Sequence, residues 1–254
     1  SVSANENAGA ALISSLKVIK DGRDTDVVLR LQDLVRINQY TLARESRNTL
    51  TSTASLPSGS ELGLVEGIVH FGVNPRNPRE ISGLVAAHDL NSFDLEVTWG
   101  TSSSLGTGYT VGSDTELVAE VMEVDLRPEE VRSVVAAGGF KRLFLLDEAT
   151  AISGNQSAYD VSAGSHPLPV GKFLRRVWVT VVNGGSRSNS YITEYRVRDK
   201  RKDADVVGPV RWVDSQMQDQ AEYFLPTTAM VVTGFSCIDF RRGWLDLRSY
   251  RPGD

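Results

Sequence analysis

The pattern of hydrophobic and polar positions along the chain is that of a protein built from β-sheets. From Phe93 to Trp99 the two kinds of residue alternate strictly, which places Phe93, Leu95, Val97 and Trp99 on one face. A period of two predicts a strand with one buried and one wetter face. Comparable apolar or alternating runs predict further strands at residues 27–31, 34–37, 64–71, 115–124, 140–146, 174–182, 191–197, 230–240 and 244–250.

Three segments favour helices instead. Residues 127–139 start with Arg127-Pro128-Glu129-Glu130, and proline at the first helical position followed by acidic residues is typical of a helix start. Residues 214–223 form a second candidate, with Asp214 as the expected N-cap. Residues 10–19 have apolar positions at the spacing of a short amphipathic helix. We interpret this last segment as an arm that packs on the body, on a neighbour or on a membrane surface.

Turns separate the predicted strands. Residues 101–113 are rich in serine and glycine and predict an exposed loop, and residues 183–186 (Asn-Gly-Gly-Ser) predict a tight reversal. Many short strands, glycine-rich turns and few helices are typical of β-sandwiches. The length of 254 residues suits two such domains, and we expect the helix at residues 127–139 to separate them.

Composition excludes some functions. The net charge is −5 with a pI of about 5.3, and the basic clusters at residues 200–202 and 241–242 are short. A nucleic-acid-binding arm needs a longer basic stripe, so direct contact with nucleic acid is not expected. The sequence has no apolar run of the roughly 18 residues that a membrane-spanning helix requires. A single cysteine, Cys237, excludes an intrachain disulfide, and its setting predicts a buried strand residue.

A search for catalytic or metal-binding motifs finds none. The histidines His70, His88 and His166 lack the spacing of a zinc site, and neither a nucleophile elbow nor a phosphate loop is present. Acidic clusters at residues 21–26 and 203–205 could supply oxygen ligands to calcium, although neither matches a complete calcium loop. We therefore expect no enzyme activity and assign no catalytic, cofactor-binding or metal-binding residue.

The order of the segments resembles a known family. In the first half, residues 67–72, 74–78 and 92–100 read as a strand, a proline loop and a long strand, and in the second half residues 168–177, 183–192 and 234–240 open, turn and close a sandwich. This arrangement resembles the double jelly-roll major capsid proteins of membrane-containing icosahedral bacteriophages, the corticovirus and tectivirus groups. The resemblance spans roughly residues 25–250.

The resemblance implies an all-β fold with two jelly-roll β-sandwiches side by side, joined by a short helix. The implied parts are an N-terminal arm at residues 1–24, a first jelly roll at 25–126, a connecting helix at 127–139 and a second jelly roll at 140–254. It also implies a structural role as a homotrimer, in which pseudo-hexagonal capsomers tile a shell around an internal membrane. Implied partners are neighbouring capsomers, minor capsid or vertex proteins and, through the arm, the viral membrane. The implied location is the virion, after synthesis in the host cytoplasm.

Other functions stay open at this point. A carbohydrate- or receptor-binding β-sandwich is the main alternative, because Trp178, Trp212 or Trp244 would stack on sugars if exposed. An enzyme that uses carboxylates on a sandwich scaffold and a minor structural protein of a virion are further alternatives.

Overall fold

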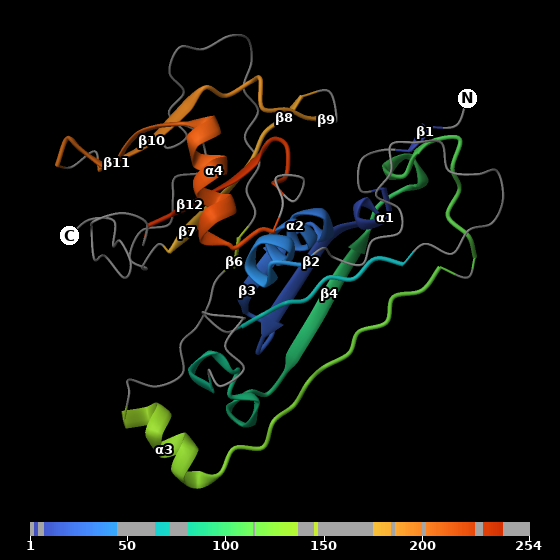
Figure 1. Ribbon diagram of the computed structural model, residues 1–254. Helices are drawn as coiled ribbons and strands as arrows, with labels where there is room; N and C mark the ends of the chain where they lie inside the picture. Colours follow the sequence, from blue (N-terminus) through green and yellow to red (C-terminus); the bar gives the residue numbers. More distant parts are fainter. Residues whose placement is uncertain are drawn as a thin grey trace. The chain divides into compact units, whose positions relative to one another are not determined.

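The chain folds into two compact units, residues 1–147 and residues 148–254, in the computed structural model (Figure 1). The structure describes residues 3–4, 8–44, 64–71, 81–113, 115–136, 145–146, 175–183, 186–199, 202–226 and 231–240. The division between the units follows Asp147, and the helix α3 (Pro128–Ala136) belongs to the first unit. The domain boundaries expected from the sequence stay a prediction.

The first unit is organised around a four-stranded sheet. Its strands are β2 (Ile13–Lys20), β3 (Asp24–Leu29), β4 (Phe93–Trp99) and β6 (Leu145–Leu146), in the spatial order β4-β2-β3-β6. Strand β2 pairs antiparallel with β3 and β4, and β3 pairs parallel with β6. The other elements are β1 (Ser3–Ala4), which pairs with β5 (Gly106–Thr107), the helices α1 (Ala8–Ala11) and α2 (Leu31–Leu42), and the 3-10 turns η1 (Ile81–Gly83), η2 (Ala87–Asp89) and η3 (Ser102–Ser104).

Helix α2 packs on β2 and closes the apolar core of this unit. Its residues Leu31, Leu34 and Val35 lie on one helical face because they are three and four positions apart. They meet buried side chains of the sheet, namely Ile13, Leu16, Val18, Val27 and Leu29. Burial of each such side chain contributes roughly 1.5–3 kcal/mol. This contact therefore accounts for much of the stability of the first unit.

The strand predicted at residues 34–37 is wrong, because this segment is the middle of α2. Four apolar or long residues in a row fit a buried strand and a helix face equally well. The helix is fixed by its ends and by an internal ion pair. Arg30 is the N-cap, Ala43 ends the helix in the left-handed conformation, and the Arg36 guanidinium lies 3.1 Å from the Asp33 carboxylate. The strand predicted at residues 27–31 is confirmed as β3, although it ends at Leu29.

The helix predicted at residues 10–19 is also wrong, because Ile13–Lys20 is strand β2 in the interior of the sheet. Its buried apolar residues, Ile13, Leu16 and Val18, do not alternate strictly. The pairing with β4 shifts register between Ile13 and Ser15, as at a β-bulge, and one extra residue there moves Leu16 back to the core face. The residues expected to form an arm therefore include a strand of the first unit.

Strand β4 and helix α3 confirm two predictions, whereas two other predicted strands are not formed. Residues 64–71 form only a single β-bridge, at Val65, and residues 115–124 form no ladder among the described residues. An alternating segment becomes a strand only where a second backbone pairs with it over several residues. Several predictions lie outside the described residues: the proline loop at 74–78, the segments at 147–173, 200–201 and 241–250, and the C-cap Gly138.

The described residues of the second unit form three antiparallel strand pairs and the helix α4. The pairs are β7 (Arg176–Thr180) with β12 (Phe235–Asp239), β8 (Val182–Asn183) with β9 (Ser186–Arg187), and β10 (Glu194–Asp199) with β11 (Ala204–Arg211); the helix is α4 (Trp212–Glu222). Strands β7, β10 and β12 confirm predicted strands, and β8 pairs with β9 across the predicted turn at residues 183–186. Strand β11 was not predicted, because Gly208 and Pro209 interrupt its pattern.

Helix α4 confirms the helix predicted at residues 214–223 but begins earlier than expected. Its N-cap is Arg211, so Asp214 lies in the first turn rather than at the cap. The Asp214 carboxylate accepts two hydrogen bonds from the Arg211 guanidinium, at 2.7 and 2.9 Å. A carboxylate in the first turn is favourable because it faces the positive end of the helix dipole.

Helix α4 is fastened to β12 by buried polar groups. The Asp219 carboxylate is fully buried and accepts hydrogen bonds from the Ser236 hydroxyl (2.7 Å) and the Cys237 backbone amide (3.0 Å). The Ser236 oxygen in turn lies 2.6 Å from the Ser215 hydroxyl, which lies 2.9 Å from the Tyr195 hydroxyl. Because Ser236 donates to the carboxylate, each hydroxyl donates in the direction of Asp219. Satisfied networks of this kind position a helix more specifically than apolar contacts do.

The turn before β12 allows a test in which alanine substitutions of two glycines should differ strongly in their effect on stability. Gly234 has φ +64°, and an added Cβ would lie 2.7 Å from the Ser188 nitrogen and 2.8 Å from the Val181 oxygen. We expect Gly234→Ala to lower the free energy of unfolding by about 2–3 kcal/mol, since backbone atoms cannot yield. Gly208→Ala is the matched control, because a Cβ there meets nothing within 4 Å. Denaturant unfolding of both variants checks this, and equal losses would contradict it.

Candidate functional site

The described residues contain no cluster of three or more histidine, cysteine, aspartate or glutamate side chains that could hold a metal ion. His70 lies in the extended segment 64–71, and His88 lies in η2. His166 lies outside the described residues. The part of the chain that the structure describes therefore brings no two of the three histidines into one metal site.

The acidic cluster at residues 21–26 has a structural use. The Asp21 carboxylate accepts hydrogen bonds from the backbone amides of Asn91 (2.6 Å) and Ser92 (3.3 Å), and these bonds lower the pKa of Asp21. Asp26 is 1% exposed and forms an ion pair with Lys20. Asp21 thus ties the β2–β3 turn to the residues before β4, and Asp26 ties β3 to the end of β2. They do not converge on a common point where calcium would bind.

The second acidic cluster, at residues 203–205, lies where β11 begins: Asp203 directly precedes the strand, and Asp205 is its second residue. Asp203 has φ +50°, a conformation that aspartate tolerates in turns, and its carboxylate lies 2.7 Å from the Arg198 guanidinium. Asp205 pairs with Arg198 in the ladder of the two strands. The cluster is thus part of a hairpin turn.

Cys237, Trp178 and Trp212 pack within the second unit, Cys237 and Trp212 in its core. Cys237 is buried in β12, as predicted, with its sulfur 3.1 Å from the Tyr223 hydroxyl. Trp212 is 1% exposed, and Trp178 stacks on Phe235 with ring centroids 5.5 Å apart. Neither tryptophan is placed to stack on a sugar, and Trp244 lies outside the described residues.

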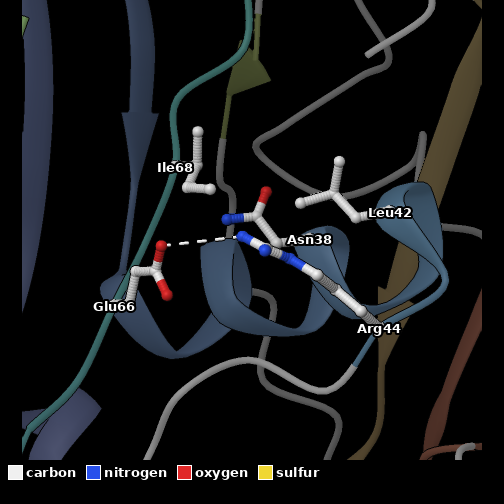
Figure 2. A pocket seen from close by; sticks show the side chains of 5 residues that line it. All are labelled: Asn38, Leu42, Arg44, Glu66 and Ile68. Atoms are coloured by element: carbon white, nitrogen blue, oxygen red, sulfur yellow. Dashed lines mark ion pairs between the residues drawn. The ribbon is translucent and has the colours of Figure 1, made fainter. Parts of the chain in front are cut away.

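A small hollow lies between α2 and the segment 64–71. Figure 2 shows Asn38, Arg44 and Glu66 around it, with Arg44 and Glu66 joined by an ion pair of 3.6 Å. Leu42 and Ile68 complete the lining, and the free volume is about 10 Å³. That volume is about the space of one water molecule, so the hollow has no room for an organic substrate.

A larger and more open hollow lies beside the end of β4. Its volume is about 450 Å³. The described residues that line it are Leu12, Trp99, Gly100, Ser102, Thr110, Val111, Gly112 and Thr115, and none of these carries a charge.

The most unusual surface of the first unit is β4 itself. The alternation predicts a buried face, but Phe93, Leu95 and Trp99 are 39%, 45% and 46% exposed, and only Val97 packs against the core. Strand β4 is also an edge of the described sheet. Residues 117–124 add more exposed apolar side chains: Leu117, Val118, Val121, Met122 and Val124. Exposed apolar groups on a sheet edge are typical of a contact with another protein surface.

None of the described helices combines the length and the apolar character that are needed to cross a membrane.

A comparison with solved structures reveals what this arrangement is similar to. The crystal structure of the STIV MCP, a major capsid protein, superposes with a TM-score of 0.59 at 17% sequence identity. The match covers 95% of this chain and 71% of the STIV chain. No protein-family model and no curated protein sequence matches the chain.

The chain has an all-β, double jelly-roll fold. This confirms the fold class predicted from the sequence. The STIV MCP, a viral coat protein, has the same fold. The comparison therefore supports the capsid-protein fold that the sequence resemblance implied. Sequence reasoning identified β4 but missed its exposure, for which the periodicity of a strand gives no signal.

The protonation of His70, near Arg44, should make the stability of the first unit depend on pH. Burial, and secondarily the charge of Arg44, lowers the pKa of His70 from its ordinary value of 6.5. Because the folded chain disfavours the imidazolium, the unfolded chain takes up this proton first as the pH falls. Stability from the neutral imidazole is therefore complete above about pH 6.5 and declines below it.

We expect the free energy of unfolding to fall more between about pH 7.5 and pH 5 in the wild type than in His70→Gln. Denaturant titrations at the two pH values measure this difference. NMR titration of the His70 ring provides a direct check, and a pKa at or above 6.5 would contradict the assignment.

Proposed function

We propose that this protein is a structural component of a viral capsid, a major capsid protein that assembles with copies of itself. The observation that carries the proposal is the fold, which resembles that of the STIV MCP over 95% of the chain. A fold alone does not specify a function, so features of the chain itself must also agree with it.

Two features of the described residues agree with a role in assembly. The exposed apolar residues of β4 and of residues 117–124 suit a surface that a neighbouring subunit covers. Of the two hollows described above, the smaller has no room for a substrate, and the described residues that line the larger one include no titratable side chain. These features favour a binding surface over a catalytic centre.

The finer part of the proposal comes from the sequence resemblance. We propose homotrimeric, pseudo-hexagonal capsomers that tile an icosahedral shell around an internal membrane, with minor capsid or vertex proteins as further partners. The protein would be made in the host cytoplasm and act in the virion. The bacteriophage lineage rests on the sequence resemblance alone. Since Ile13–Lys20 is the strand β2, a membrane contact through the N-terminal arm would involve residues that precede it.

Light scattering coupled to size exclusion tests the proposal, with calcium and with a chelator. We expect a particle of three times the chain mass of 27.7 kDa, and shells or sheets of such particles by electron microscopy. A protein that stays monomeric at every concentration in both conditions would contradict the capsid role.

Strand β4 allows a sharper test of the contact surface. We expect Leu95→Lys to weaken assembly by at least tenfold in the critical concentration, because a charge in a covered apolar face loses its hydration. The fold should persist, since Leu95 is 45% exposed in the single chain. Thr98→Lys is the matched control: it adds the same charge to the opposite face of the same strand. Equal assembly of the two variants would exclude β4 as a subunit contact.

A further inference from the structure

Helix α2 buries a polar side chain whose hydrogen-bonding capacity the protein does not use in full. Asn38 is 5% exposed, and no group of the chain accepts a hydrogen bond from its Nδ2 atom. A buried amide donor without an acceptor is costly, because it has given up its hydrogen bonds to bulk water and forms none in exchange. Buried polar groups in native proteins nearly always have a partner, either protein or ordered water. An acceptor for Asn38 should therefore lie beside it.

The position of Asn38 on α2 explains why its amide is covered. Leu31, Leu34 and Asn38 lie on one side of the helix, since they are three and four positions apart. Gly67 packs closely on the two leucines: a Cβ at this position would lie 2.5 Å from Leu31 Cδ1 and 3.1 Å from Leu34 Cδ2. Glu66 and Ile68, on either side of Gly67, border the same hollow as Asn38. Segment 64–71 thus runs close over this side of α2, where the sequence places a carboxamide instead of a further apolar residue.

The small hollow between α2 and segment 64–71 has the size and the polarity of a site for water. Its volume of about 10 Å³ is the space of one water molecule. A water molecule at such a site also needs at least two polar partners. Figure 2 shows the Asn38 amide beside the ion pair of Arg44 and Glu66. The lining therefore offers a donor, Asn38 Nδ2, and an acceptor, the Glu66 carboxylate.

We propose that this hollow is a binding site for one structural water molecule, which accepts a hydrogen bond from Asn38 Nδ2 and donates one to the Glu66 carboxylate. The water joins segment 64–71 to α2. The direct link between Arg44 and Glu66 is an ion pair of 3.6 Å between two exposed side chains, and such pairs contribute little to stability. The water bridge gives the two elements a second polar contact, on the buried side of the first.

The bridge is useful because backbone pairing holds segment 64–71 so little. Its only ladder contact is the single β-bridge at Val65. Val65, Val69 and Phe71 pack against the apolar core, which fixes one side of the segment. Glu66 alternates with these residues and points away from that side, so a polar contact has to hold it to α2.

Other occupants fit the hollow less well. An organic molecule is too large for the volume of about 10 Å³. An anion would lie against the Glu66 carboxylate, and a metal cation would compete with Arg44 for that carboxylate while facing the donor of Asn38. Water both donates and accepts, so it can bond to the amide and to the carboxylate at once.

The inference is independent of the proposed capsid role. The described residues that line the hollow all belong to the first unit of one chain, so the water should be present in a monomer and in any assembly. A monomeric protein with the water in place would contradict the capsid proposal alone. A trimer without the water would contradict this inference alone.

A crystal structure at a resolution that shows ordered water tests the site directly, with the wild-type chain. We expect one water molecule within hydrogen-bond distance of both Asn38 Nδ2 and a Glu66 carboxylate oxygen. A protein acceptor on Nδ2, or a hollow without water density beside Asn38, would overturn the inference.

The variant Asn38→Leu tests the bridge in solution, because leucine has nearly the shape of asparagine and forms no hydrogen bond. If Nδ2 had no partner, this change would leave the melting temperature unchanged or raise it. With the water bridge, we expect the melting temperature to fall by a few degrees, because the bonds to the water are lost.

A second substitution separates the bridge from the apolar gain of leucine. In a Glu66→Leu background the bridge is already broken, so Asn38→Leu should cost less than in the wild type. Arg44→Gln is the matched control background: it breaks the ion pair but leaves both partners of the water, so the cost of Asn38→Leu should persist there. An equal effect of Asn38→Leu in all three backgrounds would exclude the bridge. If a variant does not fold, judged by circular dichroism, the wild-type crystal structure decides.

Discussion

The described structure depends on one constraint: the apolar faces of the four-stranded sheet and of the β7–β12 pair must be covered by other parts of a protein. In the first unit, α2 supplies this cover with Leu31, Leu34 and Val35 packed over β2 and β3. In the second unit, α4 lies on β12, and Trp212, the first residue of α4, is buried. Strand β4 and residues 117–124 are described parts of the first unit whose apolar side chains stay largely exposed. Apolar surface of this kind is where association becomes favourable.

The helix–sheet contacts of the two units differ in chemistry. The contact of α2 with the sheet is almost entirely apolar, so its position depends on how well the side chains fill space. The contact of α4 with β12 contains a buried carboxylate, Asp219, and a sequence of hydroxyl groups that leads to it. Each group in that network has a defined partner, so a shift of the helix along the strand would leave buried polar groups without hydrogen bonds.

Several residues that could have formed enclosed binding sites have structural roles instead. The acidic residues that could have bound calcium hold a turn to β4 or close a hairpin. Cys237 lies in the core, and so does Trp212. What the described part of the chain offers to the outside is rigid sheet and helix surface with apolar side chains on it. A rigid double jelly-roll fold with exposed apolar surfaces in fixed positions is suited to repeated assembly.

The sequence by itself determined the elements whose local pattern has a single interpretation. Strict alternation identified β4, the proline and glutamates at residues 128–130 identified α3, and continuous apolar runs identified β7 and β12. The assignments failed where local pattern is ambiguous. A bulge disturbed the alternation of β2, and a short apolar run hid the helix α2. Tertiary structure alone decided which faces are covered. The side chains of β4 alternate because its backbone is extended, but their burial depends on segments distant in sequence, and no local period contains that information.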